Sequence, residues 1–331
     1  MKRILSVLEV NLLFIVLCAL LLTVGAIMQS LHIIGGLLFT EFGLILGVSL
    51  LFLKIRGGSI RDTLRLHPVK PMMLFKVVLV ALLMVPVVLF LNLIVLSLIQ
   101  TFGRVVVPAI PTATDVPSLF VMIFSIAVSA GICEEALFRG VMLRSYERDL
   151  GRKWAAVLSA LLFGMFHFNL GNLLGPIALG LVYAYYVQLS GSIYPAMLGH
   201  FVNNGTAVLV SYLASNSRDE ALRMLEGGLP EGLNAADALA DVSIIQMLIP
   251  FLLPALVGAA GAFFLIRSMR NQYPKRRSDL YEGEIDERLN YTTTHYRLWG
   301  PQPVRVRLSL VLPVILIVVA YIVLTYLTFF R

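Results

Sequence analysis

A short polar segment stands inside an otherwise apolar stretch of the chain, and its residue types suit acid–base chemistry. The segment reads Cys133-Glu134-Glu135-Ala136-Leu137-Phe138-Arg139. Glu135 and Arg139 are four residues apart with the acid first, which is the favoured order for an ion pair along a helix. Glu134 lies ~100° around the helix from Glu135, so it must face another partner. Two carboxylates with one arginine leave a surplus acid, and such a group can take and return a proton.

Two further polar pairs follow at helical spacing. Phe163 and His167 are four residues apart, and so are His200 and Asn204, so each pair projects from one side of a helix. An imidazole and an amide NH₂ that converge on one small group can stabilise an oxyanion where bulk water is excluded. A single histidine inside a membrane can also be hydrogen-bonded to a neighbouring helix, so the motifs gain their meaning together.

The rest of the chain is apolar enough to place these motifs in a membrane. Of its 331 residues, 59% are hydrophobic and 14% are charged, compared with about 45–50% and about 25% in soluble proteins. This composition excludes a soluble enzyme, a disordered chain and a disulfide scaffold; the two cysteines, Cys18 and Cys133, both lie in apolar runs. The sequence predicts an all-α, polytopic helical membrane protein.

Nine apolar runs approach the ~20 residues that a membrane helix needs. They are Val10–Met28, Ile34–Leu53, Val77–Ile99, Leu119–Leu143, Trp154–Phe168, Leu173–Leu189, Ile193–Leu213, Ser243–Ile266 and Leu308–Phe330. With the N-terminus in the cytoplasm, 21 of the 26 basic residues fall on the cytoplasmic side and four fall outside, while Arg139 lies inside a span. Because basic residues favour cytoplasmic loops, this distribution supports nine helices and a cytoplasmic N-terminus.

The spans and loops divide the chain into four parts. In order, they are the first three membrane helices, a motif-bearing core of four helices, an acidic extracytoplasmic loop, and the last two helices with a basic cytoplasmic loop at 267–307: residues 1–118, 119–213, 214–242 and 243–331. Within the acidic loop, Asp219–Glu226 is predicted to form a short helix that ends before Gly227.

Depth in the membrane brings the three motifs together. Measured from the predicted cytoplasmic helix ends at ~1.5 Å per residue, Glu134 lies ~15 Å deep, His167 ~21 Å deep and His200 ~12 Å deep. All three fall in the middle of a hydrocarbon core ~30 Å thick. Ionisable side chains at such depth are costly and usually functional. The sequence therefore predicts a polar cavity near the bilayer midplane that water can enter from one side.

The ordered motifs resemble those of a known family. Glu-Glu-x-x-x-Arg, Phe-x-x-x-His and His-x-x-x-Asn on three membrane helices resemble the CAAX protease and bacteriocin-processing family, also called the CPBP or Abi family. Its best-known members are CAAX prenyl endopeptidases of the Ras-converting type. The resemblance covers about Leu119 to Tyr212. It implies an intramembrane endopeptidase with an eight-helix core, to which this chain adds a ninth helix and a long basic loop.

Carried over by position, the resemblance implies a role for each motif residue. Glu134 and His167 would activate the attacking water, and His200 and Asn204 would bind the oxyanion of the tetrahedral intermediate. The residues that would orient and support these groups are Glu135, Arg139 and Phe163. The same roles suit peptide hydrolysis on chemical grounds, because the reaction needs a base, an oxyanion stabiliser and a proton for the leaving amine.

A bound metal is an open alternative for water activation. Glu134, His167 and His200 are two histidines and one carboxylate, the ligand composition of some catalytic zinc sites, and members of the family are commonly described as metalloproteases. A bound Zn²⁺ would lower the pKa of the attacking water. The chain lacks the His-Glu-x-x-His motif of zincins, and a metal-free glutamate mechanism uses the same residues. We favour the metal-free version and leave the metal open.

The expected partners are the lipid bilayer and a peptide or protein segment that enters from it, in the plasma membrane of a prokaryote. No basic stretch is interleaved with aromatic residues, so a nucleic-acid partner is not expected. Two other functions use the same residues. One is a proton-coupled secondary transporter with Glu134, His167 and His200 as its relay, although the motifs occur once and not as a repeat. The other is a non-catalytic immunity or scaffold protein of the membrane.

Overall fold

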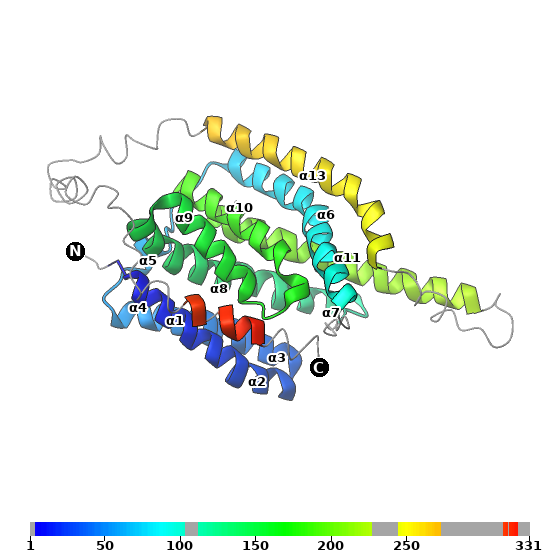
Figure 1. The fold of residues 1–331 in the computed structure, drawn as a ribbon, viewed down its shortest axis with the longest axis horizontal. Helices are drawn as coiled ribbons and strands as arrows, with labels where there is room; N and C mark the ends of the chain where they lie inside the picture. Colours follow the sequence, from blue (N-terminus) through cyan, green and yellow to red (C-terminus); the bar gives the residue numbers. More distant parts are fainter. Residues whose placement is uncertain (1–3, 103–111, 227–243, 273–313, 317, 324–331) are drawn as a thin grey trace.

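The computed structural model describes residues 4–102, 112–226, 244–272, 314–316 and 318–323. Within these ranges the chain forms helices and no strand (Figure 1). Six segments are long and apolar enough to cross a membrane: Val7–Leu31, Ile33–Ile55, Pro71–Thr101, Val116–Met165, Leu170–Ser190 and Leu248–Arg270. The expected all-α, polytopic membrane fold is confirmed.

The helices follow one another with short connections, and the segments called η are π-helical except for the 3₁₀ turn η5. The first are α1 (Val7–Leu20), η1 (Leu21–Gly25), α2 (Ala26–Leu31), α3 (Ile33–Leu38), η2 (Phe39–Val48), α4 (Ser49–Ile55) and α5 (Ile60–Thr63). The next are α6 (Pro71–Phe102), α7 (Val116–Met122), η3 (Ile123–Val128), α8 (Ser129–Glu135), η4 (Ala136–Met142) and α9 (Leu143–Met165). The last are η5 (Leu170–Asn172), α10 (Leu174–Ser190), α11 (Tyr194–Glu226) and α13 (Ile244–Gln272).

The nine spans expected from the sequence are matched only in part. The expected fourth and fifth spans meet at Gly151, where a φ of 74° interrupts the helix. The expected seventh span belongs to α11, which is helical but is not among the six apolar candidates. The expected short helix Asp219–Glu226 is the last part of α11. The ninth span, Leu308–Phe330, lies largely outside the described residues, so the count of nine stays a prediction.

Local sequence explains several of the helix ends. Ser6 begins α1 with a capping box, in which its side chain accepts from the Glu9 backbone N–H and the Glu9 carboxylate accepts from the Ser6 N–H. Asp115 and Ser118 form a second capping box at α7. Hydrogen bonds from the Ser118 hydroxyl and N–H hold the pKa of the exposed Asp115 carboxyl below its usual value. Gly191 ends α10 with a φ of 70°, a left-handed conformation that glycine adopts without strain.

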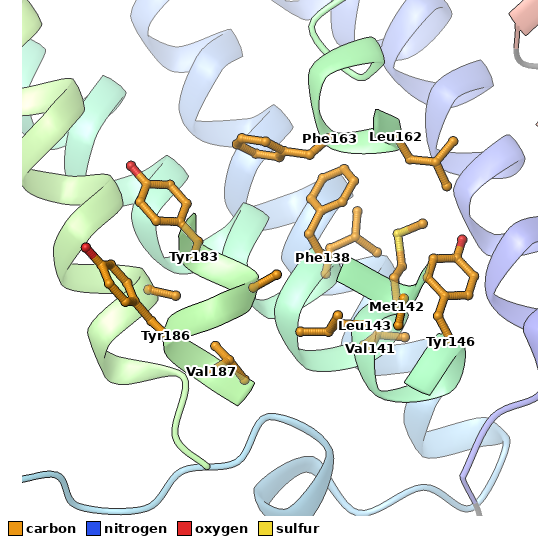
Figure 2. Packing of buried hydrophobic residues seen from close by; sticks show 14 of the residues in the cluster. Phe138, Val141, Met142, Leu143, Tyr146, Leu162, Phe163, Tyr183, Tyr186 and Val187 are labelled. Carbon is orange, nitrogen blue, oxygen red and sulfur yellow. The ribbon is translucent and has the colours of Figure 1, made fainter. Parts of the chain in front are cut away.

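The helices that carry the motifs lie in the middle of the molecule. In Figure 1, α13 runs alongside α6, and α8 to α11 lie between α6 and the N-terminal helices α1 to α4. Large aromatic side chains fill the centre. The Phe138 ring packs edge-on against Phe163 at 5.1 Å and against Phe166 at 5.2 Å between centroids. Figure 2 shows Phe138 and Phe163 together, with Tyr183 and Tyr186 on the neighbouring helix α10.

The connection between α9 and α10 differs from the sequence prediction. The predicted fifth span extends its helix to Phe168, but α9 ends at Met165 and His167 lies in the turn that follows. Phe168 has a φ of 48°, which is a left-handed conformation that cannot continue a right-handed helix. His167 therefore projects from a turn between two helices and not from a helical face.

Candidate active site

The centre of the site is a buried ion pair joined to a histidine. Nη1 of Arg139 donates to Oε1 of Glu135 over 2.8 Å, at the i, i+4 spacing read from the sequence. The same oxygen lies 2.9 Å from Nδ1 of His200. Because a carboxylate accepts the proton of this hydrogen bond, Nδ1 carries the hydrogen, and Nε2 faces the site as an acceptor or, in the imidazolium, as a donor. Glu135 and Arg139 are 0% exposed.

Glu134 faces the other side of the same imidazole. Its Oε2 lies 3.9 Å from Nε2 of His200 and has no hydrogen-bond partner among the described residues. A water oxygen placed about 2.8 Å from each of these atoms fits across that separation. Glu134 and His200 can therefore hold one water between a base and an imidazole. Glu135, the neighbouring acid, bonds to His200 directly, a contact that adds to its expected support of Glu134.

Aromatic rings enclose the ion pair and the imidazole. The guanidinium of Arg139 lies 4.3 Å from the Phe163 ring centroid, within cation–π distance. The Phe163 ring meets His200 edge-to-face at 5.6 Å and His167 edge-to-face at 5.3 Å. Tyr183 stacks on His200 at 5.4 Å with an interplanar angle of 23°. These rings limit the rotation of His200 and keep water away from the Glu135–Arg139 pair.

Gly180 allows α10 to lie directly against this buried arginine. A Cβ at Gly180 would lie 2.9 Å from the Ala160 Cα and 3.2 Å from Nη2 of Arg139. We expect Gly180→Ala to lower the free energy of unfolding by about 1–3 kcal/mol, the usual cost of overpacking. At Gly205 a Cβ would meet only the Ala127 Cβ, at 3.7 Å, so Gly205→Ala should be neutral or slightly stabilising. Unfolding by SDS in mixed micelles measures both, and equal stabilities would contradict the prediction.

His167 lies at the edge of the cluster. Its Nδ1 donates to the carbonyl oxygen of Phe163 over 3.0 Å, which leaves Nε2 free to accept a proton. Among the described residues, no hydrogen bond or ion pair joins His167 to Glu134. The structure thus brings Glu134, Glu135 and His200 into direct contact, and it links His167 to them through the Phe163 ring. Proton transfer between Glu134 and His167 would need a bridging water.

Asn204 contacts a different helix from the one that carries the acids' side chains. Its Nδ2 donates to the carbonyl oxygen of Ile126 in η3 over 3.2 Å, and the amide retains a second N–H. Gly131 in α8 brings α11 close at this level, because a Cβ there would lie 3.1 Å from the Met197 carbonyl oxygen. The close contact positions His200 and Asn204, one helical turn apart on α11, against α8 and η3.

The structure tests whether the two histidines and the acid could ligate a metal. Within the ranges that the structure describes, no three His, Cys, Asp or Glu side chains are arranged to hold a metal ion. Nδ1 of His200 is bonded to Glu135, and Nδ1 of His167 is bonded to Phe163. Glu134, His167 and His200 therefore do not form a ligand cluster that fits zinc, and no step below runs through a metal.

Two residues that the sequence does not assign to the site lie beside it. Glu41 in η2 is 8% exposed, its Oε2 has no hydrogen-bond partner in the described part of the chain, and it interacts electrostatically with Glu134. Its acidity inside a span was a visible signal, but no local pattern shows which helix the second span contacts. Tyr183 stacks on His200, yet Tyr185 and Tyr186 are chemically alike in sequence, so only the fold distinguishes it.

The fold and the site define an integral membrane protein with a buried carboxylate–imidazole centre. Residues 116–206 match the family model described as Type II CAAX prenyl endopeptidase Rce1-like. This segment carries all three motifs and forms an Rce1-like domain, so the family expected from the motifs is confirmed. The match supports a CAAX-type protease. Comparison with curated proteins and with solved structures gave no match.

Proposed function

We propose that the chain is an intramembrane endopeptidase that hydrolyses a peptide bond of a membrane-associated substrate, lipidated or amphipathic, with a water activated at Glu134. One observation carries the proposal: the unpartnered Oε2 of Glu134 lies 3.9 Å from Nε2 of His200. A base and an oriented imidazole around a water-sized gap are what general acid–base hydrolysis requires. The Rce1-like family match supports the same reaction.

Glu134 is the proposed general base. It takes one proton from the water between its Oε2 and His200, and the oxygen attacks the scissile carbonyl carbon. The tetrahedral intermediate then collapses, the C–N bond breaks, and the proton taken from water passes to the leaving amine. One water is consumed, and one carboxyl group and one amine are formed. His167, whose Nε2 is free of its bond to Phe163, suits the relay of this proton through a bridging water.

His200 and Asn204 are the proposed oxyanion donors. Because Nδ1 of His200 donates to Glu135, Nε2 becomes a donor only when the ring is an imidazolium. The buried Glu135 carboxylate stabilises that cation as the acid of a catalytic triad does, and Arg139 balances Glu135 when His200 is neutral. The N–H of Asn204 that is not bonded to Ile126 would supply the second hydrogen bond.

The membrane setting shapes the proposed substrate and location. The 21 basic residues assigned to the cytoplasmic side favour a plasma membrane with its anionic lipids on that side, and we infer a prokaryotic one. A substrate segment that is lipidated or amphipathic would then reach the site from the inner leaflet. The bilayer and this segment are the partners that the proposal requires.

Cleavage of peptides by the full chain in reconstituted vesicles tests the function. The probes are a prenylated peptide that ends in a CAAX sequence and an unprenylated amphipathic peptide, with products identified by mass spectrometry. We expect His200→Gln to lower kcat by about 10²–10³-fold, the effect of losing an oxyanion donor, with little change in KM. His67→Gln, which alters an exposed side chain, serves as the matched control and should keep the parent kcat.

Two results would contradict the proposal. The first is cleavage at the parent rate by the His200→Gln variant. The second is proton-coupled uptake of the peptides into the vesicles without cleavage, which would favour the transporter.

A further inference from the structure

The turn that carries His167 lies at a depth where a membrane protein has few ways to satisfy its backbone. After Gly151, α9 consists of residues 152–165, roughly 21 Å of helix at ~1.5 Å per residue. Arg152 and Lys153 mark its cytoplasmic end, and the hydrocarbon core is ~30 Å thick. Residues 166–173 therefore turn within the core. Irregular backbone at that depth is stable only where protein groups satisfy it, and none of these residues is exposed.

A single side chain of α6 bonds to the end of this turn. Nδ2 of Asn92 donates to Oδ1 of Asn172 over 2.8 Å, and Oδ1 of Asn92 accepts from the backbone N–H of Gly175 over 2.9 Å. The Gly175 N–H lies in the first turn of α10 and has no partner within its own helix. Because that N–H can only donate, it fixes the Asn92 amide with its oxygen toward α10 and its NH₂ toward Asn172.

Two glycines let the turn lie directly on α6. A Cβ at Gly175 would lie 2.7 Å from Cγ1 of Val88 and 2.8 Å from Oδ1 of Asn92. A Cβ at Gly171 would lie 2.6 Å from Cδ2 of Leu96. Any side chain at either position would push the turn away from α6 and stretch the bonds of Asn92. The turn is thus held by close packing as well as by its hydrogen bonds.

We propose that Asn92 is a positioning residue for His167: by bonding Asn172 and Gly175, it holds the turn in which the His167 imidazole faces the site. The conformation needs such support, since Phe168, the next residue, has a φ of 48°, and a non-glycine residue in that region is strained. Asn92 acts through the backbone and touches no reacting atom. The inference rests on the proposed function, in which His167 relays a proton.

Kinetics of peptide cleavage by the full chain in vesicles test this role. Asn92→Leu removes both hydrogen bonds, and we expect kcat to fall by up to about 100-fold, as small displacements of catalytic groups do, while KM stays close to the parent value. Asn172→Asp keeps the acceptor for Nδ2 of Asn92 and should keep kcat near that of the parent. The matched control is Ser97→Ala on the same helix, because that hydroxyl bonds only to carbonyl groups of α6.

A double-mutant cycle separates positioning from a general structural effect. In a His167→Ala background, Asn92→Leu should cause no further fall in kcat, because a positioning residue acts only through the residue that it positions. A further fall as large as in the parent would overturn the proposal. So would an Asn92→Leu variant that yields less folded protein but keeps the parent kcat per folded molecule. If His167→Ala alone keeps the parent kcat, the role of His167 in the proposed function fails, which is a separate result.

Discussion

Glu134→Gln is expected to lower kcat for peptide cleavage by about 10²–10⁴-fold, the usual effect of removing a general base. Glutamine keeps the shape of the side chain, but its amide cannot take a proton from water. Because Oε2 of Glu134 has no hydrogen-bond partner in the described structure, the substitution breaks no internal bond at that atom. Folding and KM should therefore change little, and the loss would report on chemistry.

The control for this variant is the neighbouring residue. Cys133 is fully buried and precedes Glu134 on α8, so Cys133→Ala disturbs the same helix without removing an acid–base group. We expect this variant to keep kcat near the parent value. Single-turnover rates in vesicles compare the two variants directly. Parent-like cleavage by Glu134→Gln would rule out Glu134 as the base and point to Glu41, the carboxylate that interacts with it.

Features that depend on neighbours along the chain could be predicted from the sequence. The ion pair of Glu135 with Arg139 follows from i, i+4 spacing, which places the two side chains on one helical face. The divergence of Glu134 from that pair follows from the ~100° turn per residue. Hydropathy likewise identifies apolar helices without knowledge of their packing. These local rules were enough to predict the fold class and to select the motif residues.

Features that depend on contacts between distant helices could not be predicted in the same way. The bond between Glu135 and His200 joins residues 65 positions apart, and no periodicity in either helix reveals it. The turn at His167 is a similar case. The local sequence Phe166-His167-Phe168 has no proline or glycine, so helical spacing appeared to continue through it. Contacts with α6, above all those of Asn92, favour the turn over further helix.

Arg139→Met is expected to have the largest effect on stability. The guanidinium and the Glu135 carboxylate are both fully buried, so removing the cation leaves an uncompensated buried charge, at a cost of about 3–5 kcal/mol in the free energy of unfolding. Methionine fills much of the volume and packs well against the ring of Phe163. The cost therefore reflects mainly the lost charge and not a cavity. Unfolding by SDS in mixed micelles, followed by circular dichroism, measures it.

The double variant Glu135→Gln with Arg139→Met separates stability from activity. With both charges removed, no buried carboxylate lacks its counter-ion, and replacing a whole buried ion pair is often neutral or stabilising. The double variant should thus recover most of the stability lost in Arg139→Met. Its kcat should stay low, because the glutamine oxygen can accept from Nδ1 of His200 but cannot stabilise the imidazolium as a carboxylate does. A double variant no more stable than Arg139→Met would show that Arg139 stabilises the fold through its aromatic contacts and not through Glu135.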